Sequence, residues 1–260
     1  MLLNAVIIIL REVMEASLII SLFLAFSQRH RINRFWLVSA LPVGLISAII
    51  YAMSIVTVSQ WFDGVGQEIV NATIHSLIYL MLLLLVVLSF QTEMQSYKKV
   101  MRCLMFIGVV LASIREGSEI ILYIHGFISR PELLKPVLFG GAIGAGIGVS
   151  IGVFFYYLLV NISKRAGITL GILLCLLVAG GMVLQATQLL SQADWLPSQY
   201  PLWDTSYWVS ESSMIGQLLY ALVGYEATPT AIQVISYITA VSSICILAYF
   251  SHLSTLRHKK

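Results

Sequence analysis

Charged side chains are scarce in this sequence. Only 10% of the 260 residues are Asp, Glu, Lys or Arg, and 59% are hydrophobic, whereas about a quarter of the residues are charged in ordinary soluble domains. The mean hydropathy is +0.92. The few Lys and Arg residues do not gather into a basic patch, so a nucleic-acid partner is not indicated. The composition predicts an all-α polytopic membrane protein.

Cysteine and several catalytic signatures are also rare or absent. Cys103, Cys175 and Cys245 stand alone without ligand spacing, which indicates neither a disulfide framework nor a zinc site. No Glu has a His three residues later, as the di-iron carboxylate proteins require. No Gly-Lys-Ser/Thr follows the glycine-rich run at 140–152, so a phosphate-binding loop is excluded and helix packing is the expected role of these glycines.

Long apolar runs, in contrast, fill most of the chain. Seven are long enough to cross about 30 Å of hydrocarbon, and they lie at about 4–26, 35–58, 69–90, 103–126, 136–160, 166–190 and 230–250. A shorter run at about 212–225 is too short to span and is expected to lie at the interface or to re-enter the membrane. We therefore predict seven transmembrane helices in a single integral membrane domain, residues 1–260.

The basic residues between these runs predict the orientation. Eleven fall on one side of the predicted membrane, namely Arg29, Arg31, Arg34, Lys98, Lys99, Arg102, Lys164, Arg165, Arg257, Lys259 and Lys260. Only Arg130 and Lys135 fall on the other side. The protein is expected in the cell membrane. The positive-inside rule then places its N-terminus outside the cell and its C-terminus in the cytoplasm. Residues 1–97 and 98–190 would form an inverted repeat, followed by an outer loop at 191–229 and a seventh helix.

Two charged motifs interrupt the apolar runs. The first is Arg11-Glu12-Val13-Met14-Glu15, and the second is Arg115-Glu116-Gly117-Ser118-Glu119. On a helix the three charged side chains of each motif share one face. A charge at the bilayer centre costs at least about 2.5 kcal/mol, so six of them in a matched pattern indicate a functional site.

Four carboxylates in these motifs suit a highly charged cation that prefers oxygen ligands. We predict that Glu12, Glu15, Glu116 and Glu119 are metal ligands. Arg11 and Arg115 would hold the carboxylates as ion-pair partners when the site is empty. No cofactor is expected, since the metal would be the transported substrate.

Other polar residues are weaker candidates. His75 and His125 lie near helix ends and are expected to be satisfied by water or backbone. The segment at 191–229 contains Asp194, Asp204, Glu211 and Glu226 but no Lys or Arg. Its negative charge would concentrate cations at the outer mouth and could dock a partner. Asp204 and Glu211 are therefore candidate capture ligands.

Together these features resemble the ferric iron permease family, which includes the fungal high-affinity iron permease and the bacterial EfeU type. The resemblance rests on the two motifs, on the predicted topology and on Gly224-Tyr225-Glu226-Ala227-Thr228-Pro229 before the last helix. Trp203-Asp204-Thr205-Ser206 and Gly216-Gln217-Leu218-Leu219 are similar to the outer loop of that family. The likeness extends over nearly the whole chain.

The resemblance implies iron uptake through the four Glu residues, with iron delivered by a partner oxidase or an extracytoplasmic iron-binding protein. One departure concerns the start of the third predicted helix. Bacterial relatives tend to carry Glu-x-x-Glu-Gly there, whereas this chain has Glu68-Ile69-Val70-Asn71-Ala72. Glu68 is thus a further candidate capture ligand, although one carboxylate has become an amide.

Three alternatives stay open at this point. A permease for lead or another divalent cation would use the same carboxylates. A membrane-embedded carboxylate metalloenzyme would also pair Glu residues on helices. A structural subunit could instead use the charges to bind neighbouring helices, which predicts that no metal binds.

Overall fold

The structure is a computed structural model that describes residues 1–90 and 95–257. These residues form eight α-helices and one short 3-10 helix. The bounds are α1 Leu2–Arg29, α2 Phe35–Ser59, η1 Phe62–Gly64, α3 Gly66–Ser89, α4 Gln95–His125, α5 Pro131–Asn161, α6 Lys164–Gln192, α7 Met214–Val223 and α8 Ala231–Arg257. The prediction of an all-helical chain is confirmed.

Five helices, α2, α3, α5, α6 and α8, are long and apolar enough to cross a membrane. Helices α1 and α4 have 28 and 31 residues, which is also sufficient length. Each of them carries one three-charge motif, whereas none of the other five helices has more than two charged residues. The protein is therefore a multi-pass membrane protein, and a membrane crossing by α1 and α4 stays a prediction.

Helices α1 and α5 form the most extensive helix pair of the bundle, and glycines explain how they approach. Gly140, Gly144, Gly148 and Gly152 are all buried. A Cβ atom at Gly144 would collide with the carbonyl oxygen of Val6, and one at Gly148 would lie 3.1 Å from the amide nitrogen of Met14. The absence of side chains thus brings the backbone of α5 against the helix that carries the first motif.

Helices α2 and α4 form the corresponding pair around the second motif. Ala40, Gly44, Ala48 and Ala52 recur every fourth residue along α2 and are buried. A Cβ atom at Gly117, inside the second motif, would lie 3.0 Å from the Cβ of Ala48. Each motif helix therefore packs against a helix with a stripe of small residues, although our sequence analysis recognised only the stripe in α5.

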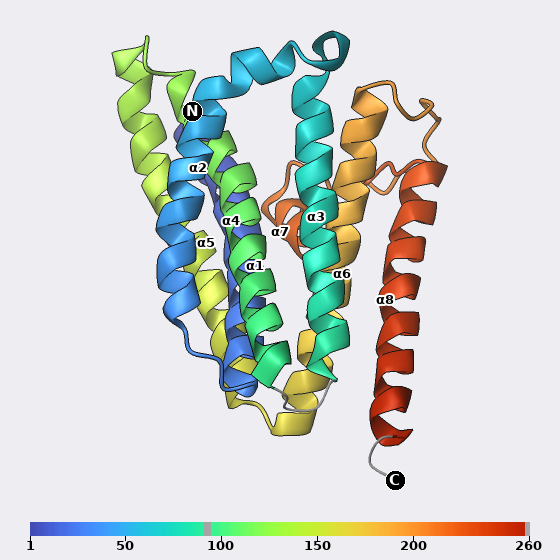
Figure 1. Cartoon of the computed structure of the whole chain (residues 1–260). Coiled ribbons are helices and arrows are strands. Elements are labelled where there is room, and N and C mark those ends of the chain that lie inside the picture. Colours follow the sequence, from blue (N-terminus) through green and yellow to red (C-terminus); the bar gives the residue numbers. More distant parts are fainter. Residues whose placement is uncertain (91–94, 258–260) are drawn as a thin grey trace.

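The remaining long helices complete the bundle. Helices α3 and α6 pack against each other, and α8 lies against both, as Figure 1 shows. Their shared core includes Ile78, Leu82, Leu85, Met182 and Ile244, which are fully or almost fully buried. The hydroxyl groups of Tyr79 and Ser243 hydrogen-bond across the α3–α8 contact at 2.6 Å.

The helices run alternately up and down, so the N-terminus and the C-terminus lie at opposite ends of the bundle (Figure 1). We call these ends the N-side and the C-side. The ends of α1 and α8 and the starts of α2, α4 and α6 lie on the C-side. The described basic residues outside the motifs therefore fall there, apart from Arg130 and Lys135, which flank the start of α5 on the N-side.

Helix α7 enters the bundle from the N-side instead of lying flat across it. Its Ala221 is buried against Met14 and Leu18 of α1, at the level of the first motif. Ser213 caps its first turn by accepting a hydrogen bond from the Gly216 amide at 3.0 Å. The position of this short apolar run relative to the membrane, at the interface or re-entrant, stays a prediction.

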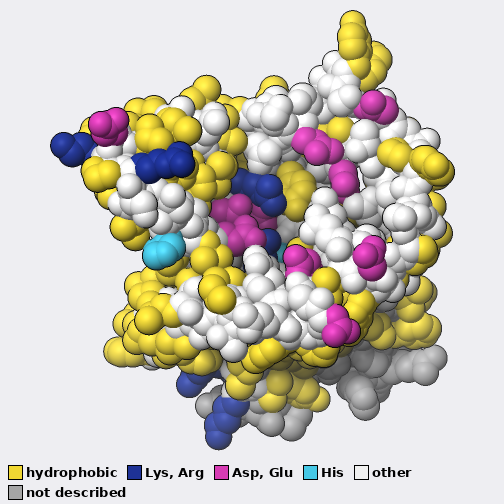
Figure 2. Space-filling model, turned by 90° about the horizontal axis from the view of Figure 1, so that it is seen from above, with side chains coloured by type: hydrophobic (Ala, Val, Ile, Leu, Met, Phe, Trp, Pro, Cys, Tyr) yellow, Lys and Arg dark blue, Asp and Glu magenta, His cyan; other side chains and the backbone are white. Residues whose placement is uncertain are grey.

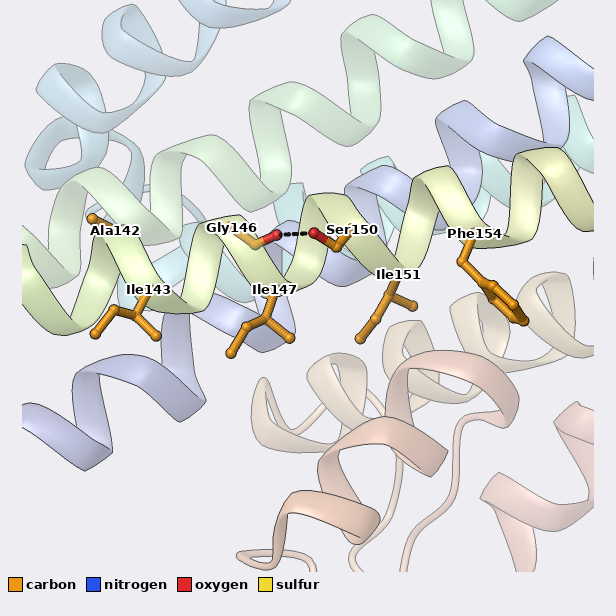
Figure 3. A pocket seen from close by; sticks show the side chains of 7 residues that line it. All are labelled: Ala142, Ile143, Gly146, Ile147, Ser150, Ile151 and Phe154. Carbon is orange, nitrogen blue, oxygen red and sulfur yellow. Dashed lines mark hydrogen bonds between the residues drawn. The ribbon is translucent and has the colours of Figure 1, made fainter.

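An apolar groove of about 590 Å³ runs along α5. Figure 3 shows Ile143, Ile147, Ile151 and Phe154 projecting to one side of that helix. The hydroxyl of Ser150 donates a hydrogen bond to the carbonyl oxygen of Gly146 at 2.7 Å. Because its lining is mostly aliphatic and aromatic, the groove suits lipid or another apolar surface better than a cation.

Candidate metal site

The two motifs face each other where α1 and α4 pack together in the middle of the bundle. Because the two helices run in opposite directions (Figure 1), the order of the charges is reversed between them. Arg11 and Glu119 lie toward the N-side, whereas Glu15 and Arg115 lie deeper. Glu12 and Glu116 occupy the level between these two pairs.

In the first motif the arginine is the more accessible member. The side chain of Arg11 is 27% exposed, and its Nε lies 3.3 Å from Oε1 of Glu15 and 3.8 Å from Oε1 of Glu12. Its guanidinium lies over the ring of Tyr220 in α7, 4.1 Å from the ring centroid. Glu15 is 3% exposed, and its Oε2 accepts a hydrogen bond from Nε2 of Gln185 at 3.1 Å.

In the second motif the arginine is the buried member. The Arg115 side chain is 7% exposed, and its Nη1 forms an ion pair with Oε1 of Glu119 and lies 3.9 Å from Oε2 of Glu116. Glu119 is the accessible carboxylate, with 31% of its side chain exposed. Glu116 is only 1% exposed, and within the described residues neither of its oxygens has a hydrogen-bond partner.

All four predicted carboxylates therefore come together, in two groups whose ligand atoms lie within 4.8 Å of one another. One group consists of Glu12, Glu116 and Glu119, and the other consists of Glu15, Glu116 and His75. Glu116 belongs to both. Unpaired, buried carboxylate oxygens are costly unless a cation or a proton joins them. The arrangement could hold a metal ion in either group.

The placement of His75 corrects our sequence analysis. We expected a lone histidine near a helix end, satisfied by water or backbone. Instead His75 lies in the third turn of α3, is 0% exposed and joins the carboxylates. Only its Nδ1 contacts backbone, at 2.9 Å from the carbonyl oxygen of Asn71. A single sequence does not reveal which face of α3 turns toward α1 and α4, so this residue carried no signal. His125 is exposed, as expected.

A cavity of about 310 Å³ opens above the carboxylates on the N-side. Its walls come from α1, α4, α6 and α7 together with Glu211 of the segment between α6 and α7, and they include Arg11, Arg115, Glu119, Gln185, Gln188, Gln192, Gln217 and Tyr220. Figure 2 looks into the molecule from this end and shows acidic and basic side chains at the floor of the hollow. A hydrated cation thus has a polar path to Glu119.

The three candidate capture ligands differ in their position relative to the cavity. Glu211 lines the cavity, although its Oε1 also accepts a hydrogen bond from the Ala227 amide at 2.7 Å. Glu68 lies in the first turn of α3, and its Oε2 is buried without a hydrogen-bond partner among the described residues. Asp204 is exposed and does not line the cavity. Hydrogen bonds from Ser206 lower the pKa of Asp204 by stabilising its charged form.

The segment between α6 and α8 is held together by the residues that carry the family resemblance. The Tyr225 hydroxyl donates to the carbonyl oxygen of Val209 at 3.0 Å and lies 2.8 Å from the hydroxyl of Thr205. Gly224 ends α7 with a φ of +68°, and a Cβ there would clash with Gly181 of α6. Only glycine combines this backbone angle with such a close approach. These residues hold α7 beside the site.

The fold and the site define a class: a multi-pass helical membrane protein with a buried, carboxylate-rich site reached through a polar cavity. The chain matches the Iron permease FTR1 family over residues 2–259 and belongs to that family. Its members are transporters, which implies that the protein is a permease for iron and not an enzyme. No curated protein and no solved structure is significantly similar to the chain.

Proposed function

We propose that the protein imports ferric iron through the site formed by the two motifs. The observation that carries the proposal is Glu116, a buried carboxylate that accepts no hydrogen bond from the described residues and is shared by two groups of potential ligands. Such a carboxylate needs a positive partner, and Arg115 approaches it only at 3.9 Å. A cation bound between Glu12, Glu116 and Glu119 would provide one.

The arginines would stabilise the empty site. Arg11 and Arg115 each pair with the glutamate one turn further along the helix, at positions 15 and 119. When iron arrives through the cavity, Glu119 would leave Arg115 and bind the metal. The guanidinium groups would then repel the cation and favour its release, so the same pairs would support both capture and passage.

The direction of transport follows from the proposed orientation. The described basic residues outside the motifs, apart from Arg130 and Lys135, gather on the C-side, which would face the cytoplasm, and the cavity opens on the N-side. Helix pairing also supports an inverted repeat of residues 1–97 and 98–190, because α1 packs on α5 as α4 packs on α2. The segment 191–229 and the helix at 230–250 would follow this repeat.

A partner would deliver the iron at the N-side. The segment 191–229 contains four acidic residues and no Lys or Arg, and Glu211 reaches the cavity. An extracytoplasmic oxidase or iron-binding protein with a basic surface would dock there by charge complementarity. Lead or another divalent cation is the alternative substrate, since oxygen ligands favour ferric iron only as a tendency.

Uptake of radiolabelled iron tests this proposal. Cells would express the wild-type chain, Glu12→Gln, Glu116→Gln or the control Glu132→Gln, whose residue is exposed at the start of α5. Ferric and ferrous supply, and lead, would be compared at matched expression. We expect uptake to be lost in the first two variants and kept in the control. Normal uptake by both site variants would refute the proposal.

A further inference from the structure

The proposed function uses only the four carboxylates and assigns no role to the buried imidazole of His75. This residue lies on α3, outside both motifs, and all of its surface is buried. Its Nε2 atom has no hydrogen-bond partner among the described residues, and the atoms that could ligate a metal with it belong to Glu15 of α1 and Glu116 of α4. A third helix thus contributes a potential ligand.

The hydrogen bond at the other ring nitrogen fixes the state of this imidazole. Nδ1 lies 2.9 Å from the carbonyl oxygen of Asn71, and a carbonyl oxygen can only accept, so Nδ1 carries the proton. In the neutral ring Nε2 then carries a lone pair. Metal-binding histidines are typically oriented in this way, with the second nitrogen donating to a backbone carbonyl or a carboxylate.

The surroundings of Nε2 call for a cation. Its lone pair and the carboxylate oxygens of Glu15 and Glu116 are all acceptors, so none of them can satisfy another when the carboxylates are ionised. A metal ion among the three would satisfy them together. Gln185 further orients Glu15 by donating to its Oε2, the oxygen that is not paired with Arg11.

We propose that His75 is a metal ligand and that Glu15, His75 and Glu116 form an inner binding position below the all-carboxylate position of Glu12, Glu116 and Glu119. This inference rests on the proposed transport function. The cation would pass from one position to the other while staying bound to Glu116. Because imidazole suits iron and other transition metals better than Mg²⁺ or Ca²⁺, the inner position would select against those hard divalent ions.

Pulsed electron paramagnetic resonance of bound Mn²⁺ tests the assignment. The full chain, purified in detergent, would be loaded with one equivalent of Mn²⁺, and modulation by a directly bound nitrogen would be recorded. We expect ¹⁴N modulation in the wild type and in the control His125→Gln. Growth on ¹⁵N-histidine should convert it to ¹⁵N modulation, a readout that needs no mutation at the site.

The variant His75→Gln should lose the nitrogen signal and bind Mn²⁺ at least about tenfold more weakly, while Mg²⁺ competes more effectively against Mn²⁺ than it does in the wild type. Persistence of the nitrogen signal in this variant, or its absence from a wild type that binds Mn²⁺, would overturn the inference. If iron uptake still depends on Glu12 and Glu116, the proposed function survives that result. A wild type that neither transports iron nor binds Mn²⁺ would refute both.

Discussion

The two copies of the motif have the same charged residues in the same order, but the accessible charge is the arginine in the first copy and a glutamate in the second. Arg11 is accessible and its partner Glu15 is buried, whereas Arg115 is buried and its partner Glu119 is accessible. The reason is helix direction: α1 runs away from the N-side and α4 runs toward it. The same order of charges on two helices that run in opposite directions thus gives a site with an outer and an inner level.

The largest difference that this comparison predicts concerns the two middle carboxylates. Glu116 belongs to both ligand groups and Glu12 to only one. We expect Glu116→Gln to weaken Mn²⁺ binding by the purified chain about 100-fold and Glu12→Gln about tenfold, which correspond to about 2.8 and 1.4 kcal/mol. Titration calorimetry would measure both, with Glu132→Gln as the control. Equal losses would show that the motifs are interchangeable.

The second largest effect concerns the two arginines, which should differ in how strongly a lysine substitution reduces iron uptake. Lysine cannot reproduce the planar fork of a guanidinium, and the cost is greatest where water cannot fill the gap. We therefore expect Arg115→Lys to reduce iron uptake about tenfold and Arg11→Lys only about twofold at matched expression. Arg130→Lys, at an exposed residue outside the site, is the control. A larger effect at Arg11 would contradict the assignment of outer and inner levels.

The two motif helices also differ in how tightly their partners approach. Gly144→Ala places a methyl group against the backbone of α1, so the helices must separate, at a cost of about 1 to 3 kcal/mol. Gly117→Ala meets only the Ala48 methyl at 3.0 Å, and adding Ala48→Gly should restore its stability. Thermal unfolding in detergent would compare these variants. Failure of that rescue would mean that Gly117 has another role.

Among the described residues, only the first of the two motifs has an arginine in a cation–π contact. Arg11 lies over the ring of Tyr220, and α7, which brings this ring, has no counterpart in the first half of the chain. Tyr220→Leu should lower the stability by about 0.5 to 2 kcal/mol, and Tyr220→Phe should retain most of it. Thermal unfolding would again measure the shift. The contact contributes little if Leu and Phe have the same effect.

The helices and the motif residues could be predicted from the sequence because a hydrophobic run and a charge within it are local signals. The repeated charges even predicted that α1 and α4 would meet. His75 was missed, because the face that α3 turns to the site depends on packing with α4 and α6. Ala40 and Ala48 of α2 were also overlooked, since alanine suits any apolar helix and becomes informative only when α4 is seen against it.

The smallest effect that we predict lies in the segment 191–229, which lacks any equivalent in the first half of the chain. Burial and the neighbouring carboxylate of Glu211 raise the pKa of Glu226 to about 7, although a hydrogen bond from Gln233 opposes this. The folded chain therefore holds this proton more tightly than the unfolded chain, whose Glu has a pKa near 4.3. The stabilising contribution is complete below that value and is lost as the pH rises through about 7.

Backbone hydrogen exchange around residues 226–233, corrected for intrinsic rates, would detect this loss. In the wild type we expect less protection at pH 8 than at pH 5.5. Glu226→Gln should show equal protection at both, because its uncharged amide cannot repel Glu211. Asp204→Asn is the control: the lowered pKa of Asp204 keeps it ionised throughout this range, so its removal should leave the pH dependence unchanged. If Glu226→Gln loses protection as the wild type does, another group of the segment governs its response to pH.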